Sequence, residues 1–253
     1  MDHEKGRELL KKTQEASPPV QPEVEDGKLT TSPFTEAVSK ITQKAVTPNR
    51  DVYQPPSLAD YIKRTVEYIT DPHAEGRIDV PLRALKCVEA ALAVEGKWKQ
   101  TFLTVKEKLT KGETILLYGP RWTGKTVLAM ALWAEINRFC HRAVYVKQIE
   151  LLRKMRLWFN NQDEGEYYSY TSRRNKILII DEAGVKVRGD QLSESDSALL
   201  TTMIDDRYAS ELSTVFISNE SLPEIINCLG PTIMRRIAEC GTAIECNWGP
   251  FGK

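Results

Sequence analysis

Residues 114–126 read TILLYGPRWTGKT, and the part from Gly119 to Thr126 fits the pattern G-x-x-x-x-G-K-[ST]. The apolar run TILLY before it predicts a buried β-strand, and the residues after it predict a helix from about Lys125 to Cys140. A strand, a glycine-rich turn and a helix in this order are typical of a loop that binds nucleotide phosphates. A chance match with both flanking elements in place is rare, so this stretch predicts a P-loop.

The residues of the loop match the chemistry that phosphate binding needs. Backbone N–H groups of a glycine-rich turn can converge on phosphate oxygens, and the following helix N-terminus adds partial positive charge. We expect an exposed Lys125 to reach the β- and γ-phosphates of ATP and the Thr126 hydroxyl to bind Mg²⁺. The expected ATP-binding residues of this stretch are Gly119, Pro120, Arg121, Trp122, Thr123, Gly124, Lys125, Thr126 and Val127.

A second motif places two acids directly after an apolar run. Ile177–Ile180 predicts a central strand buried on both faces, and Asp181 and Glu182 follow it. Ligands bind at the carboxyl ends of strands in open α/β sheets. We therefore expect Asp181 to hold Mg²⁺ through water, and Glu182 to orient and deprotonate the water that attacks ATP.

Two further features are open to more than one interpretation. Asn219 ends the predicted strand Thr214–Ser218, where its amide could reach the γ-phosphate, although Asn is also common in turns. With the other two motifs present, we favour a functional Asn219. Arg235 and Arg236 lie in a predicted helix, either as solvated surface residues or as an arginine finger for a neighbouring subunit.

Strands and helices alternate through the second half of the chain. Further strands are predicted at Ala143–Lys147 and Ala243–Asn247, and further helices at Ile149–Asn160, Ser193–Ala209, Leu222–Cys228 and Thr232–Cys240. This alternation predicts an α/β fold with a mostly parallel sheet flanked by helices on both faces. Because only 34 residues follow Asn219, we expect no C-terminal helical lid.

The N-terminal part has a different character. Residues 1–57 contain seven of the 13 prolines, which predicts a flexible and partly disordered tail. An apolar stripe within 34–45 is either a nascent turn or a short amphipathic helix that docks on a partner, and we favour neither. Helices are then predicted at Leu58–Thr70, Leu82–Leu92 and Trp98–Leu109.

We therefore divide the chain into three parts. Residues 1–57 form the tail, residues 58–77 a helical linker or partner-binding segment, and residues 78–253 the ATPase domain. Ser57 and Asp60 form a capping-box-like start for the first helix of the linker.

Composition limits the classes of function. Lys+Arg and Asp+Glu are both 35, so contacts with nucleic acid would have to come from local patches. No apolar stretch is long enough to cross a membrane, and the charged N-terminus is not a secretory signal, so we expect a cytoplasmic protein. The five cysteines lack C-x-x-C spacing, which predicts reduced, mostly buried thiols and no zinc site.

Four stretches together resemble the DnaC-type replicative helicase loaders, which are AAA+ ATPases related to the IstB transposition helpers. The stretches are Asp181–Val185 (DEAGV), Ile204–Arg207 (IDDR), Ser218–Asn219 and Leu229–Arg236 (LGPTIMRR). The resemblance covers roughly Ile78 to Trp248. It implies an AAA+ fold that associates with itself through its ATP sites, and it gives the P-loop, the Asp–Glu pair and Asn219 the roles described above.

The resemblance also implies roles for arginines at a subunit boundary, and it has departures. Arg236 stands at the family's M-x-R step and is the expected finger, while Arg207 matches an arginine that faces the boundary. Arg235 replaces a common acid, which leaves open which of the two adjacent arginines acts. Trp122 stands where these loaders usually have Gly, which leaves loop shape and turnover open. The tail has no cysteine, unlike the zinc-bearing N-terminus of some loaders.

Cations and aromatic residues gather in the segment Leu151–Arg174, which we expect to contact single-stranded DNA. Aromatic faces stack bases without sequence preference, and cations follow the phosphate backbone. The resemblance implies a DNA-contacting insertion at this place, and we favour Arg156, Trp158, Arg173 and Arg174 as its contacts. Acidic residues in the same loop and helically spaced apolar residues support the alternative, a helix that packs on the sheet.

These expectations lead to one function and two alternatives. The resemblance implies an ATPase that binds the replicative helicase hexamer and helps to place it on single-stranded DNA at a replication origin. The first alternative is an IstB-like transposition helper that assembles on duplex DNA, and the second is a nucleotide-dependent adaptor with little hydrolysis. The long tail followed by a helix suits a tethered partner-binding arm and favours the loader.

Overall fold

The computed structural model describes residues 54–74, 78–140, 142–161, 170–171, 175–185 and 192–249. The chain divides into two units, Met1–Tyr53 and Gln54–Lys253, and all described residues belong to the second. Residues 1–53 of the predicted tail, with the apolar stripe at 34–45, lie outside the described residues. So do Arg173 and Arg174.

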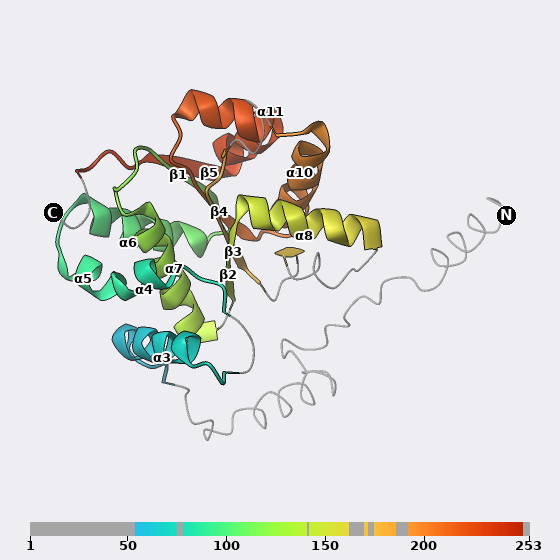
Figure 1. The fold of residues 1–253 in the computed structure, drawn as a ribbon. Coiled ribbons are helices and arrows are strands. Elements are labelled where there is room, and N and C mark those ends of the chain that lie inside the picture. Colours follow the sequence, from blue (N-terminus) through green and yellow to red (C-terminus); the bar gives the residue numbers. More distant parts are fainter. Residues whose placement is uncertain are drawn as a thin grey trace, which may run out of the picture. The chain divides into compact units, whose positions relative to one another are not determined.

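A five-stranded parallel sheet forms the centre of the described unit, with the strand order β2-β3-β4-β1-β5 (Figure 1). The strands are β1 (Thr114–Tyr118), β2 (Ala143–Lys147), β3 (Ile177–Asp181), β4 (Ser213–Ile217) and β5 (Gly241–Glu245). All four pairings are parallel, which confirms the prediction from the alternating elements. The carboxyl ends of all five strands therefore lie at one edge of the sheet.

Helices cover both faces of this sheet (Figure 1). One face carries α3 (Leu58–Thr70), α4 (Leu82–Lys86), α5 (Val88–Ala93), α6 (Lys97–Leu109) and α7 (Lys125–Cys140), and the other carries α8 (Gln148–Asn161), α10 (Glu194–Ala209) and α11 (Leu222–Cys240). Side chains of each strand alternate between the two cores: Ile115 and Leu117 pack in the first, and Leu116 in the second. The α/β fold with helices on both faces is thus confirmed.

The helix predicted over Leu82–Leu92 differs from the structure, whereas the two helices predicted between Leu222 and Cys240 are confirmed. The pattern over Leu82–Leu92 forms two short helices, α4 and α5, which are separated at Cys87. These two helices are the two parts of α11, and Gly230 separates them at a kink where φ is 80° and ψ is 164°. Pro231 follows this left-handed glycine, and a proline cannot donate a helical hydrogen bond, so the helix changes direction here.

The first described helix belongs to the core of the compact unit Gln54–Lys253. Asp60 N–H donates to Ser57 Oγ (3.1 Å), which confirms the predicted cap of α3. Ile62 is 4% exposed and packs with the helices on its face of the sheet. The helix that we expected in a linker at 58–77 is therefore part of the compact unit that begins at Gln54.

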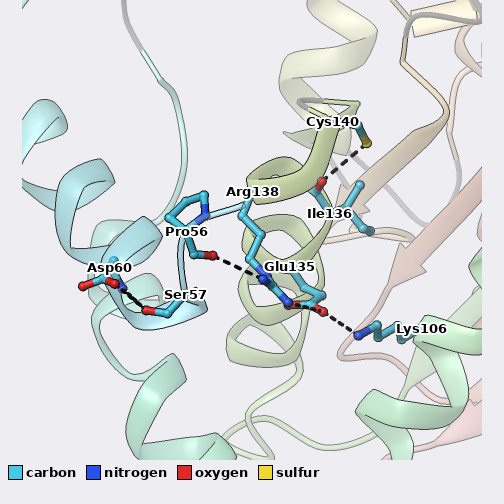
Figure 2. A network of polar contacts seen from close by, with 8 residues as sticks. All are labelled: Pro56, Ser57, Asp60, Lys106, Glu135, Ile136, Arg138 and Cys140. Carbon is cyan, nitrogen blue, oxygen red and sulfur yellow. Dashed lines mark hydrogen bonds and ion pairs between the residues drawn. The ribbon is translucent and has the colours of Figure 1, made fainter. Parts of the chain in front are cut away.

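A polar network fixes the far end of α7, the helix that begins at the P-loop (Figure 2). The buried Glu135 accepts hydrogen bonds from Arg138 and from Lys106 of α6, and Arg138 also donates to the carbonyl of Pro56 (3.2 Å). Burial acts to raise the pKa of Glu135, but Arg138 and Lys106 together outweigh it and lower the pKa. The ionised carboxylate thus connects α7 with α6, and Arg138 connects α7 with the chain that precedes α3.

The described helices and the cysteines test two further predictions. None of the described helices is long and apolar enough to cross a membrane. All five cysteines are free thiols, but only Cys228 and Cys246 are buried. Cys140 and Cys240 are exposed because they are the last residues of α7 and α11, so the prediction of mostly buried cysteines is wrong.

Candidate nucleotide-binding site

The P-loop, residues 119–126, connects β1 to α7 at the carboxyl edge of the sheet. Gly119 has φ 130° and Gly124 has φ 79°, conformations that side chains disfavour. A Cβ atom on Gly119 would also lie 3.0 Å from the carbonyl oxygen of Cys246, which follows β5. Both glycines of the motif are therefore required by the shape of the loop.

Trp122 adopts the same left-handed conformation with a large side chain. Its φ is 70°, and its side chain is 82% exposed at the tip of the loop. A non-glycine residue in this region costs of order 1–3 kcal/mol. The loop therefore keeps a conformation that suits glycine, and the indole is placed in solvent, where it does not block the interior of the loop. Arg121 beside it is also exposed.

Lys125 is buried, with 4% of its surface exposed, so the prediction of an exposed lysine is wrong. Its Nζ donates to the carbonyls of Gly119 (2.9 Å) and Pro120 (2.6 Å) and to Thr123 Oγ1 (3.2 Å). The side chain folds back over the loop because these oxygens compensate its buried charge. Burial lowers the pKa of Lys125, and the carboxylate of Asp181 opposes this shift.

Asp181 is held from three sides. Its Oδ2 accepts hydrogen bonds from Thr126 Oγ1 (3.0 Å) and from the Tyr145 hydroxyl (2.8 Å), and its Oδ1 accepts one from the Glu182 N–H (2.7 Å). Burial, with the charge of Asp181, raises the pKa of Tyr145 far above its ordinary value, so this phenol remains a donor. Our sequence reasoning missed Tyr145, because a tyrosine within an apolar strand has the pattern of a core residue.

The residues around Asp181 fit a magnesium ion. Thr126 and Asp181 supply a hydroxyl and a carboxylate that converge within hydrogen-bonding distance. Mg²⁺ prefers oxygen ligands and is usually bound by one or two carboxylates together with substrate phosphates. Among the described residues, no group of three or more His, Cys, Asp and Glu side chains could hold a metal ion by itself. The donor set therefore suits a metal that arrives with a phosphate ligand.

Glu182 begins the turn after β3 with a positive φ of 57°. Its Oε1 accepts a hydrogen bond from Lys147 Nζ (2.7 Å) at the end of β2, and the side chain is 40% exposed. This hydrogen bond raises the pKa of Lys147. Lys147 lies opposite Asp181 in the register of β2 and β3, a pairing that sequence reasoning did not foresee.

Asn219 lies between the two motifs. It follows β4, which pairs with β1 on one side and with β3 on the other, and its side chain is half-buried. Hydrogen bonds beyond the strands, from Ser218 N–H to Leu117 O (2.9 Å) and from Ala183 N–H to Ile217 O (2.7 Å), join the three strand ends. The fold thus brings the P-loop, Asp181, Glu182 and Asn219 to one edge.

The predicted boundary arginines have different surroundings. Arg207 is completely buried, so the prediction that it faces a subunit boundary is wrong. Its five N–H groups reach five oxygens, and these belong to Tyr170, Asn175, Lys176, Ser213 and Thr214. The side chain thereby joins α10 to β4 and to the chain before β3, which is a structural arrangement.

Arg235 and Arg236 lie on the second part of α11. The Arg236 guanidinium donates to Asp205 (2.9 Å) and Glu239 (3.3 Å) and lies over the ring of Tyr208, and its side chain is 21% exposed. Arg235 is 62% exposed, and its ion pair with Glu239 is longer, at 3.7 Å. Arg235 is therefore the freer of the two side chains, and Arg236 is the more fixed.

The segment expected to bind DNA is only partly described. Arg156 forms a bidentate ion pair with Asp196: its Nε donates to Oδ1 (2.6 Å) and its Nη2 donates to Oδ2 (2.5 Å). The carboxylate therefore compensates much of the positive charge of Arg156. Trp158 is half-buried, and its indole nitrogen has almost no contact with solvent. Tyr170, another aromatic residue of this segment, is buried. The described geometry favours packing of α8 on the sheet.

The chain matches a family model over most of this domain. The model describes an IstB-like ATP binding protein, and it matches residues 100–237, which is more than half of the chain. The match includes the P-loop, the Asp181–Glu182 pair, Asn219 and both arginines of α11.

Two curated relatives and one solved structure are similar to the chain. The replicative helicase loader DnaC of Escherichia coli (strain K12) is 24% identical over 125 residues, 49% of each chain. An ATP-binding protein of insertion sequence IS1162 from Pseudomonas fluorescens is 30% identical over 129 residues, 51% of this chain and 52% of that protein. The chain thus spans about half the length of these relatives. AMPPCP-bound DnaA from Aquifex aeolicus has a similar fold, with a TM-score of 0.51 and 20% identity over 60% of this chain and 47% of that chain.

Proposed function

Because the chain belongs to the family of IstB-like ATP-binding proteins, we propose that it is an ATP-dependent loader of a replicative DNA helicase. The observation that carries the proposal is the convergence of the P-loop, Asp181, Glu182 and Asn219 at one edge of the sheet. ATP binding and hydrolysis at this edge would drive the loading of the helicase onto single-stranded DNA at an origin.

In the proposed reaction, the loop N–H groups and Lys125 bind the phosphates of ATP. Lys125 Nζ exchanges its loop oxygens for the β- and γ-phosphate oxygens, which are stronger acceptors because they are charged. Thr126 and Asp181 would hold Mg²⁺, which would neutralise charge on the phosphates when bound. Tyr145 keeps the Asp181 carboxylate in place through its hydroxyl.

Glu182 and Asn219 act on the water that attacks the γ-phosphate. The water oxygen bonds to the γ-phosphorus while the bond to the β-phosphate oxygen breaks and ADP leaves. Glu182 accepts the proton of this water, which requires that its hydrogen bond from Lys147 is broken or weakened. Asn219, between the two motifs, is placed to orient the water or the γ-phosphate through its amide. Since Lys147 holds Glu182 here, turnover by the isolated chain is expected to be slow.

A second copy of the chain supplies a further positive charge, which stabilises the negative charge of the transition state. We place the arginine finger in the Arg235–Arg236 pair of α11, with self-association through the ATP sites. Arg236, the residue that the family resemblance selects, is pre-oriented by Asp205 and Tyr208, whereas Arg235 is free to extend. Arg207 has no part in this proposal, because it is buried.

The partner assignments rest on the relatives. The similarity to a protein named as a replicative helicase loader supports binding of a helicase hexamer, and we assign this contact to residues 1–57 and 58–77. We propose that single-stranded DNA contacts Arg156, Trp158, Arg173 and Arg174. We also propose that the protein is cytoplasmic. The second candidate function is that of a transposition helper, and it is supported by the 30% identity to the insertion-sequence protein.

Two sets of measurements test the proposal. Lys125→Ala should abolish binding of a labelled ATP analogue, and Glu182→Gln should bind the analogue but lose hydrolysis. Parental binding by the first variant would overturn the P-loop assignment, and parental turnover by the second would overturn the role of Glu182.

Partner choice is measured separately. The purified chain should retain the replicative helicase of its host in a pull-down with ATP, and Lys125→Ala should retain less. Retention of a transposase, together with ATP-dependent binding to duplex DNA, would favour the transposition helper. Helicase retention with no measurable hydrolysis in any mixture would leave the adaptor as the function.

A further inference from the structure

Two tryptophans from outside the motif donate hydrogen bonds to the backbone of the P-loop. Trp98 Nε1, in the first turn of α6, donates to the carbonyl of Gly124 (3.1 Å). Trp248 Nε1, in the chain after β5, donates to the carbonyl of Thr123 (2.7 Å). Both tryptophans lie outside the region that the family model matches, residues 100–237.

The direction of these two carbonyls decides the direction of two N–H groups. In a planar trans peptide, the C=O of one residue and the N–H of the next point in opposite directions. The described residues contain no cis peptide bond. A Thr123 carbonyl turned toward Trp248 therefore turns the Gly124 N–H away from it, and a Gly124 carbonyl turned toward Trp98 does the same for the Lys125 N–H.

These two N–H groups lie at the start of α7, where helix N–H groups have no intrahelical partner. Such groups bind anions when they converge. A glycine at 124 has unusual rotational freedom, and its φ of 79° must be selected against other conformations. The Gly124 carbonyl also accepts a helical hydrogen bond from Leu128 N–H (2.9 Å), and the bonds to the two indoles restrict Gly124 further on both sides.

Both donors are held in place by the fold. Trp98 is 7% exposed and its ring stacks on Phe102, with 6.2 Å between the ring centroids and an interplanar angle of 5°. Trp248 packs partly buried against the same core. Its segment is tied to the start of the loop by the hydrogen bond from Cys246 N–H to Tyr118 O (2.7 Å). The two indoles thus brace the loop from the elements before β1 and after β5.

We propose that Trp98 and Trp248 are positioning residues for nucleotide phosphates: their indole N–H groups orient the peptide units around Gly124 so that the Gly124 and Lys125 N–H groups face the phosphates. The inference rests on the proposed ATP binding at this loop. The two indoles thus pre-organise the loop, and this lowers the entropic cost of ordering the loop when nucleotide binds.

The test compares nucleotides with different numbers of phosphates. Trp248→Phe and Trp98→Phe keep an aromatic ring but remove the donor. A hydrogen bond of this kind contributes about 1 kcal/mol, so each variant should bind ATP and ADP about 3–10-fold more weakly. Affinity for AMP, which lacks β- and γ-phosphates, should change less than twofold. Titration calorimetry or competition with a labelled analogue measures all three.

Trp133→Phe is the matched control. Trp133 is 5% exposed and contacts Tyr61, so the variant loses core packing in α7 at a distance from the loop carbonyls. It should melt at a lower temperature with the same ratio of ATP to AMP affinity as the parent. If Trp98→Phe does not fold, Trp248→Phe carries the test, because Trp248 is only half-buried near the end of the described chain.

The outcomes separate this inference from the proposed function. A parental ratio of ATP to AMP affinity in Trp248→Phe, in a protein where Lys125→Ala abolishes binding, would overturn the role of the indoles and leave the proposed function intact. A parental chain that binds no ATP would overturn both. A selective loss for ATP and ADP in the two indole variants, with Trp133→Phe unchanged, would support the inference.

Discussion

Replacing Arg207 by lysine should destabilise the fold strongly while keeping the charge. All five N–H donors of the guanidinium are used, and four of the five acceptors are backbone carbonyls, those of Tyr170, Asn175, Lys176 and Ser213. Burial lowers the pKa of Arg207 to about 9, so the guanidinium is still protonated at neutral pH. A lysine ammonium has three donors, so at least two of the buried oxygens would lose their partner.

The magnitude follows from this count of donors. A hydrogen bond to a charged group contributes about 1.5–3 kcal/mol, so the loss of two predicts a destabilisation of about 3–6 kcal/mol. For a chain of this size, about 1 kcal/mol corresponds to roughly 2–4 °C in melting temperature. We therefore expect the melting temperature of Arg207→Lys to fall by about 6 °C or more.

Urea unfolding and thermal melting measure this prediction. Arg235→Lys is the control, because Arg235 is 62% exposed and its replacement should change the stability by about 0.5 kcal/mol or less. If Arg207→Lys stays within about 1 kcal/mol of the parent in urea, the five hydrogen bonds do not stabilise the fold as argued.

Three further predictions concern the nucleotide edge and the surface. Tyr145→Phe removes a donor from Asp181 and should raise the Mg²⁺ concentration needed for tight ATP binding about tenfold, and an unchanged Mg²⁺ titration would contradict this role. Arg236→Ala should keep ATP affinity but lower assembly-dependent turnover, and a larger effect of Arg235→Ala would assign the finger to Arg235. The hydrogen bond from Arg156 is the largest of the effects that lower the pKa of Asp196. The pair therefore stabilises the fold above the unfolded-state pKa of about 4, and this stabilisation is lost as the pH falls through the folded-state pKa. The destabilisation by Asp196→Asn in urea should accordingly shrink as the pH falls below about 4, and a difference that stays constant would contradict this role of the pair.

Local patterns were sufficient for the elements and for the main motifs. Strand β1 has the predicted bounds, Thr114–Tyr118. A short apolar run before a glycine-rich turn indicates both that the segment forms a strand and that the strand is buried. The motifs lie at strand ends, and parallel strands place their carboxyl ends together. Their convergence therefore followed from the fold class without knowledge of the side-chain contacts.

The contacts that could not be predicted join residues distant in the sequence. An arginine in a helical pattern looks the same whether it is solvated or buried, so the role of Arg207 could not be inferred. Lys147 and Tyr145 contact the acidic pair only because β2 pairs with β3 in one register. Trp98 and Trp248 had only the pattern of core residues, since hydrogen bonds to loop carbonyls leave no periodic signal.

The close approach of residues 246–249 to the P-loop has a practical consequence for handling the protein. Here Cys246 pairs with Tyr118 and crowds Gly119, so shortening the chain before Cys246 would remove one wall of the nucleotide site. Loss of nucleotide affinity in a chain cut before Cys246 would therefore report a damaged loop and not an inactive family member.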